Sequence, residues 1–221
     1  ITSLDLNRTR RYEGWLPTQV DHVAITSQAD RQAMLDLQTD RQASAPISII
    51  PNGVDCDYFN SNSGVERDPA TVVLSGKMSY HANVSMALYL VNEIMPIVWA
   101  ERPDVKVLIV GKDPPGAVRS LADNPAVTVT GTVDDIRPYL QKASLAVVPL
   151  LYGAGVQNKV LEAMACGTPV VATPQAVQAL STVANQDILL GDSPKGLAEQ
   201  ILLLVQNPDL QKRVGQAGRS Y

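Results

Sequence analysis

Residues 149–173 read PLLYGAGVQNKVLEAMACGTPVVAT, and this stretch decides the fold. An apolar run ends at Pro149, a glycine-containing loop follows, and a helical pattern begins near Val156. Gly167 predicts the end of that helix, and a second apolar run follows it. A strand, a glycine loop, a helix and a further strand in this order predict two parallel strands joined by a helical crossover.

The same alternation continues on both sides of this stretch. Apolar residues recur at helical spacing from 84 to 98, where Pro96 predicts a kink, and Ser193 before Pro194 predicts a helix start. The other apolar runs are continuous, as in strands buried on both faces. We therefore predict an α/β protein with a doubly wound, parallel, Rossmann-like sheet of about six strands and helices on both faces. The predicted strands are 71–75, 105–111, 127–130, 145–149, 169–173 and 188–190.

Residues 1–70 have a different pattern. Helices are predicted at 8–16 and 28–37, with strands at 20–26 and 47–51 and a polar break at 40–46. Because one strand cannot form a sheet, the strand at 20–26 must pair with another.

Composition excludes several classes of protein. The 221 residues are 45% hydrophobic and 18% charged with a net charge of −4, so neither a disordered chain nor a nucleic-acid-binding surface is expected. Cys56 and Cys166 lie too far apart for a zinc motif, and we expect no disulfide framework, metal or other cofactor. The longest apolar runs are shorter than the ~20 residues of a membrane span, and no signal peptide is visible. We expect a cytoplasmic protein.

The helix after Gly155 carries the most informative polar residues. Asn158, Lys159 and Glu162 fall on one flank of a helix whose other flank is apolar. A glycine loop leading into a helix start offers unpaired backbone N–H groups and the positive end of the helix dipole, which suit a phosphate. Lys159 adds positive charge, and Glu162 can accept hydrogen bonds from sugar hydroxyls. The glycines alone fit a plain turn equally well, and the three polar residues favour a nucleotide site.

Two other strand ends are weaker candidates. Gly76 and Lys77 follow the first strand of the predicted sheet, where ligands of open α/β sheets bind, although an ordinary turn explains these two residues better. Residues 130–135 read TGTVDD and fit a loop whose Asp134 caps the next helix. His22 and His81 are better explained as a structural and a surface histidine than as catalytic residues.

Three stretches resemble the donor-binding half of retaining glycosyltransferases of the GT-B fold, family 4 (glycosyl transferases group 1), which includes many exopolysaccharide enzymes. The upstream segment ISIIPNGVDCDYF resembles the start of the second domain in that family. The resemblance thus assigns residues 1–43 to the tail end of a missing acceptor domain plus linker, and 44–221 to the nucleotide-sugar-binding domain. The three stretches are VVLSGKMSYHANVSMALYL, VTVTGTVDDIRPYLQKASLAVVPLLYGAG and VQNKVLEAMACGTPVVAT.

The resemblance implies transfer of a sugar from a UDP- or GDP-linked donor, without an obligatory metal, to a glycan or lipid-linked acceptor held by the missing domain. Glu162 matches the carboxylate that binds the ribose, Gly76 and Lys77 match a Gly-Arg pair, and Val133 matches the position beside the base. Peripheral association of the full-length protein with the inner membrane face fits this activity. The backbone amides that meet the diphosphate and sugar are assigned to Gly155, Val156, Gln157 and Asn158.

Two positions depart from the family pattern. Ala154 stands where a first carboxylate faces the donor sugar, and Ala82 stands where a second basic residue completes the diphosphate clamp. We expect Lys159 to compensate for the missing clamp residue, so that Lys77, Lys159 and Glu162 carry the chemistry. Residues 1–221 alone, without the missing acceptor domain, are expected to be catalytically inactive. The alternatives are a catalytically degenerate nucleotide-binding or interaction module, favoured by the two alanines, and a nucleotide-sugar epimerase relative.

Overall fold

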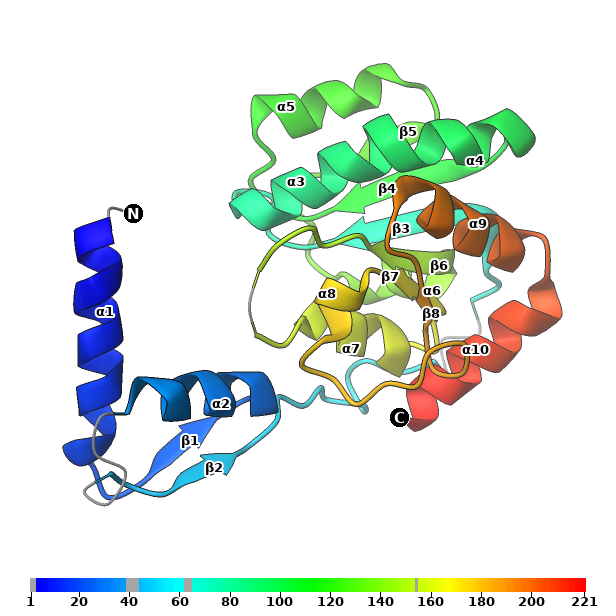
Figure 1. The fold of residues 1–221 in the computed structure, drawn as a ribbon. Coiled ribbons are helices and arrows are strands. Elements are labelled where there is room, and N and C mark those ends of the chain that lie inside the picture. Colours follow the sequence, from blue (N-terminus) through cyan, green and yellow to red (C-terminus); the bar gives the residue numbers. More distant parts are fainter. Residues whose placement is uncertain (1–2, 39–43, 62–64, 154) are drawn as a thin grey trace. The chain divides into compact units, whose positions relative to one another are not determined.

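The computed structural model describes residues 3–38, 44–61, 65–153 and 155–221, and the chain divides into two compact units (Figure 1). The first unit comprises residues 1–52 with 178–180, and the second comprises 53–177 with 181–221. The assignment of residues 1–43 to the end of a preceding domain stays a prediction.

The first unit is a small parallel sheet with helices. Val23 of β1 lies opposite Ile47 of β2, so the strand predicted at 20–26 has its partner within the chain. The Ser27 side chain accepts a hydrogen bond from the Asp30 N–H and so caps α2. The elements of this unit are α1 (Ser3–Trp15), a 3₁₀ turn (Leu16–Thr18), β1 (Val23–Ile25), α2 (Gln28–Leu37) and β2 (Ile47–Ile49).

The second unit is the predicted parallel sheet. Its six strands are hydrogen-bonded in the order β5-β4-β3-β6-β7-β8, and all pairs are parallel. Every residue of β6 is buried, which confirms that the continuous apolar runs are strands covered on both faces. The strands are β3 (Asp68–Ser75), β4 (Lys106–Val110), β5 (Val127–Val129), β6 (Ala143–Val148), β7 (Val170–Ala172) and β8 (Leu189–Leu190).

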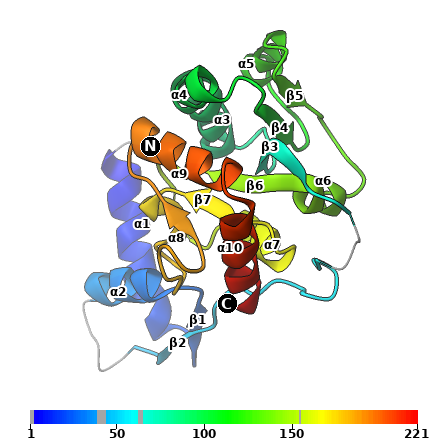
Figure 2. The same cartoon turned by 90° about the vertical axis from the view of Figure 1, so that its right-hand side faces the viewer.

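Helices cover both faces of this sheet. In Figure 2, α3, α4 and α9 lie along one face, and α6 and α7 lie along the other. The predicted cap of α9 is confirmed, because the Ser193 Oγ accepts a hydrogen bond from the Gly196 N–H. The helices are α3 (His81–Tyr89), α4 (Met95–Glu101), α5 (Gly116–Arg119), α6 (Arg137–Lys142), α7 (Asn158–Ala165), α8 (Pro174–Val177), α9 (Pro194–Val205) and α10 (Pro208–Ser220).

The helical region around Pro96 is interrupted as predicted. A π-helical stretch (Leu90–Ile94) separates α3 from α4, and Pro96 lies in the first turn of α4. A proline has no N–H to donate, and a first turn needs none, so this placement removes the conflict.

Two predicted helix starts differ from the structure. The helix predicted near Val156 begins at Asn158. The helix predicted to be capped by Asp134 begins at Arg137, and the Asp135 carboxylate accepts the hydrogen bond from the Arg137 N–H.

Candidate functional site

The order of the strands places the topological switch point of the sheet, where a ligand crevice is expected, between β3 and β6. From β3 the chain adds β4 and β5 on one side, and from β6 it adds β7 and β8 on the other. The loops after β3 and β6 therefore diverge at the carboxyl ends of adjacent strands, where open α/β sheets bind ligands. Most of the residues predicted for the site lie on these two loops and on the start of α7.

Close backbone packing positions Gly76 and Lys77. The Gly76 N–H donates to the Val110 carbonyl at 3.0 Å, and the Met78 N–H donates to the Lys112 carbonyl at 2.9 Å. Gly111 has a φ of 155°, and a Cβ there would lie 1.7 Å from the Gly76 carbonyl oxygen. Only glycine allows this approach. The Lys77 side chain is exposed beside it.

A cavity of about 360 Å³ opens at the ends of β3, β4 and β5. It brings together three of the predicted residues, Gly76, Lys77 and Val133. Tyr58 and Phe59, which sequence reasoning did not select, line it as well. The lining combines aromatic and apolar side chains with two lysines, Lys77 and Lys112, and two aspartates, Asp134 and Asp135. Apolar walls with a few polar groups are typical of small-molecule sites.

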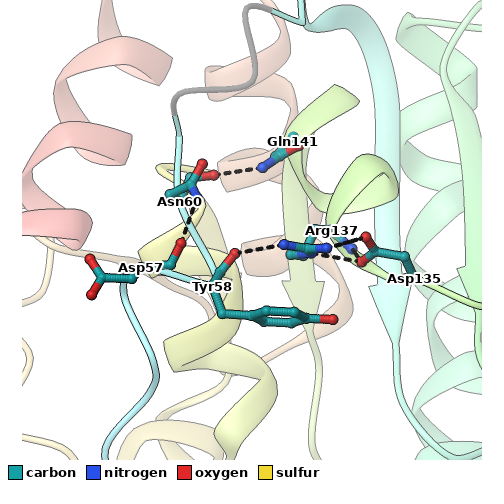
Figure 3. Close-up of polar contacts among 6 residues, drawn as sticks. All are labelled: Asp57, Tyr58, Asn60, Asp135, Arg137 and Gln141. Carbon is teal, nitrogen blue, oxygen red and sulfur yellow. Dashed lines mark hydrogen bonds and ion pairs between the residues drawn. The ribbon is translucent and has the colours of Figure 1, made fainter.

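An ion pair stiffens the Tyr58 side of this cavity (Figure 3). The Arg137 guanidinium lies 3.8 Å from the centre of the Tyr58 ring and donates to the Tyr58 carbonyl. It also binds both carboxylate oxygens of Asp135, at 2.9 and 2.6 Å. These hydrogen bonds lower the pKa of Asp135 and raise the pKa of Arg137, so both stay charged at neutral pH.

The start of α7 receives no capping hydrogen bond from its N-cap side chain. Gln157 occupies the N-cap position without a side-chain hydrogen bond to the helix, and Gly155 has a φ of 78°. Val156 is half-buried and Asn158 is exposed. The positive end of the α7 dipole therefore faces the loop, and the Gln157 side chain does not cap it. Ala154, where the family pattern has a carboxylate, lies outside the described residues.

Lys159 connects this helix to the loop after β3. Its Nζ donates to Asn83 Oδ1 at 2.7 Å and to Gln157 Oε1 at 3.5 Å. Asn83 Nδ2 in turn donates to the Lys77 carbonyl at 2.8 Å. Burial lowers the pKa of Lys159 to about 8, although the nearby Glu162 carboxylate acts in the opposite direction. Burial also raises the pKa of Glu162, against the effect of Lys159.

The loop after β6 is held against the start of α3. The Tyr152 hydroxyl lies 2.8 Å from Ser85 Oγ and 3.2 Å from His81 Nδ1, and the two rings stack with centroids 5.4 Å apart. His81, predicted as a surface histidine, is exposed and makes this contact at the first residue of α3. At the other end of the loop, Gln175 Nε2 donates to the Gly153 carbonyl at 2.7 Å.

Sequence reasoning did not select Asn83, Tyr152 or Arg137. Asn83 could have been found, because it is a polar residue among apolar neighbours near the start of a predicted helix. In the structure it is only 5% exposed. Tyr152 and Arg137 carry no such signal, since the contacts that bring them to the site, with Ser85 and with the Tyr58 carbonyl, join residues 67 and 79 apart in the sequence.

Two further findings concern metals and membranes. In the part of the chain that the structure describes, no three His, Cys, Asp or Glu side chains gather where they could hold a metal ion. Among the same residues, none of the helices has the length and apolar character needed to span a membrane.

A doubly wound sheet with a glycine loop and an uncapped helix start at its switch point defines an α/β protein of the nucleotide-binding type. The family model described as glycosyl transferases group 1 matches residues 69–207. The chain belongs to this family, which confirms the resemblance seen in the sequence.

The comparisons with individual proteins agree with this assignment. A phosphatidyl-myo-inositol mannosyltransferase of Mycobacterium leprae is 29% identical over 216 residues, which cover 92% of this chain and 54% of that protein. This chain thus spans about half the length of that relative.

Two solved structures share the fold. A variant of Staphylococcus aureus TarM, determined with UDP, superposes with a TM-score of 0.78 at 18% identity, covering 99% of this chain and 43% of that one. The C-terminal domain of a group 1 glycosyltransferase from Francisella tularensis gives a TM-score of 0.60 at 15% identity, covering 76% of this chain and 95% of that domain. The match to an isolated C-terminal domain confirms that the large sheet has the donor-half architecture of the GT-B fold.

Proposed function

We propose that the second unit binds the nucleoside diphosphate part of a UDP- or GDP-linked sugar and presents the sugar for transfer, with retention, to an acceptor. The acceptor, a glycan or a lipid-linked saccharide as in exopolysaccharide synthesis, would bind a preceding domain that residues 1–43 complete. The full-length protein would act in the cytoplasm, at the inner membrane face where the acceptor is a lipid.

The unpaired charge of Lys159 carries this proposal. Within the described residues its ammonium makes no ion pair, and its two contacts are amide oxygens. A half-buried cation is stabilised chiefly by an opposite charge. Among the residues that the structure describes, the carboxylate acting on Lys159 is that of Glu162, and it lies beyond ion-pair distance. A diphosphate at the start of α7 would supply the missing negative charge, at the positive end of the helix dipole.

The remaining predicted residues fit the other parts of a nucleotide. Lys77, at the mouth of the cavity, would approach the diphosphate from the β3 side, and Glu162, one turn into α7, would accept hydrogen bonds from the ribose. The base would occupy the cavity beside Val133. UDP in the S. aureus structure, a protein of the same fold, supports this class of ligand.

Departure of the nucleoside diphosphate is the step this site can assist. Negative charge develops on the leaving phosphate as the bond to the sugar breaks, and Lys77, Lys159 and the α7 dipole would stabilise that charge. Binding also fixes the sugar relative to the acceptor. The leaving phosphate oxygen can take the acceptor proton, so the proposed transfer needs no side-chain base.

Calorimetric titration of the chain with UDP, GDP and ADP tests the proposal. We expect one of them to bind with micromolar affinity and Glu162→Gln to weaken that binding about tenfold, since a hydrogen bond to a charged group contributes roughly 1.5–3 kcal/mol. Glu199→Gln, on the exposed side of α9, is the matched control. Absence of binding for all three nucleotides would instead favour the degenerate module.

Lys159→Ala tests the role of the buried cation. Loss of a charge close to the diphosphate in a site sheltered from water should weaken binding by at least tenfold. Lys195→Ala removes the same charge from a side chain that is 82% exposed and should leave the affinity unchanged. Equal affinities of Lys159→Ala and the unmodified chain would contradict the proposed role.

A further inference from the structure

We infer that Asn83 is a positioning residue of this site, which holds the Lys159 ammonium and the backbone at Lys77 at a fixed separation for one diphosphate. The inference rests on the proposed function and adds a residue to which the sequence analysis assigned no role.

Both polar atoms of the Asn83 amide are used, and each faces the partner that its chemistry requires. Oδ1 accepts from Lys159 Nζ at 2.7 Å, and Nδ2 donates to the Lys77 carbonyl at 2.8 Å. An ammonium can only donate and a carbonyl can only accept, so the amide has one orientation that satisfies both neighbours. With 5% of its surface exposed, Asn83 has little freedom to exchange these partners for water.

The position of Asn83 is itself fixed from two sides. Its N–H donates to the Tyr80 carbonyl at 2.9 Å in the turn that begins α3. The same turn is held against the loop after β6 through the contacts of the Tyr152 hydroxyl with His81 and Ser85. The amide therefore connects the two loops of the crevice through a rigid element, and the four-carbon side chain of Lys159 is ordered before any ligand binds.

In this chain the second positive charge of the clamp comes from Lys159 of α7, and not from position 82 as in the family pattern. Ala82, which aligns with the second basic residue of the clamp, is 2% exposed and carries no charge. The next residue, Asn83, receives the Lys159 ammonium from α7 instead. The two cations of the clamp thus come from two different strand ends, Lys77 after β3 and Lys159 after β6. Asn83 determines the distance between the Lys159 ammonium and the Lys77 backbone.

The groups around Lys159, Asn83 among them, predict how nucleotide affinity changes with pH. Glu162, on α7, is the charged group that acts on the ammonium, while α3 presents the neutral Asn83 amide and the β3 loop presents the Lys77 carbonyl. Because burial lowers the pKa of Lys159 to about 8, the free protein loses this charge above pH 8. A bound diphosphate favours the charged form, so affinity should fall by up to about tenfold per pH unit above pH 8.

Asn83→Asp separates positioning from folding. The carboxylate pairs with Lys159 and raises its pKa, but it competes with the diphosphate for the ammonium and repels the Lys77 carbonyl. We expect UDP, or GDP if that is the ligand, to bind about tenfold more weakly at pH 7, with affinity that stays level between pH 7.5 and 9. Asn92→Asp, on the exposed side of the adjoining helical turn, should reproduce the affinity and the pH profile of the unmodified chain.

The outcomes distinguish this inference from the function on which it rests. Unchanged affinity and pH profile in Asn83→Asp, with binding intact in the unmodified chain, overturn the role of Asn83 alone. An unmodified chain that binds neither nucleotide overturns the proposed function together with this inference. Should Asn83→Asp not fold, Asn83→Ala removes both the acceptor for Lys159 and the donor to the Lys77 carbonyl, and unweakened binding by that variant equally overturns the inference.

Discussion

At the scale of single residues, one arginine joins segments that are far apart in the sequence. The Arg67 guanidinium donates to the carbonyls of Leu140, Ala143 and Cys166 and to the Thr168 hydroxyl, at 2.9 to 3.2 Å. Burial lowers the pKa of Arg67, and its polar partners are neutral oxygens. It satisfies the carbonyls of Ala143 at the start of β6 and Cys166 at the end of α7, and it shares the Leu140 carbonyl of α6 with the Thr168 hydroxyl.

Arg67→Met should therefore destabilise the chain markedly. The substitution roughly keeps the length of the side chain but removes the donor to the Ala143 and Cys166 carbonyls, which we expect to lower the free energy of unfolding by about 2–4 kcal/mol. Urea denaturation measures the change. Arg213→Met, at an exposed position of α10, should cost less than about 0.5 kcal/mol. A change at Arg67 no larger than at Arg213 would show that water replaces these contacts.

At the scale of elements, the ends of β3 and β4 are the part of the sheet most sensitive to an added side chain. Gly111 allows the chain after β4 to pass against the carbonyl of Gly76, with a backbone conformation that side chains rarely adopt. The crevice therefore depends on glycine twice, once to bring the two loops together and once, at Gly155, to turn the chain into α7.

Gly111→Ala should damage both the fold and the site. The new Cβ would overlap the Gly76 carbonyl oxygen, so the loop that carries Lys77 must move, and we expect a loss of about 3 kcal/mol in the free energy of unfolding. Nucleotide affinity should fall with it. Gly116→Ala, at the start of α5, meets no atom within 4 Å and should be neutral or slightly stabilising. Thermal unfolding of the two variants checks the contrast.

At the scale of the whole molecule, the two units differ in size and in the completeness of their cores. The second unit contains the six-stranded sheet and the residues of the candidate site, while the first has two three-residue strands. Two short strands are marginally stable alone, whereas a six-stranded sheet covered on both faces is self-sufficient.

Residues 53–221 are therefore expected to fold without the first unit. We expect a cooperative thermal transition and the nucleotide affinity of the longer chain, because every proposed ligand contact lies within the second unit. Circular dichroism and calorimetric titration of this fragment measure both properties. Loss of cooperativity, or of binding in a folded fragment, would show that the first unit contributes to the core or to the site.

Local patterns of apolar residues, glycine and proline were enough to predict the parallel sheet, the helix cap at Ser193 and the glycine loop before α7. Only the tertiary structure decided that Lys159 contacts Asn83, 76 residues away, and that Arg137 lies over the Tyr58 ring. The reason is physical. Periodicity along the chain reports which face of an element is buried, whereas the partner of a polar side chain depends on which strand ends the sheet order brings together.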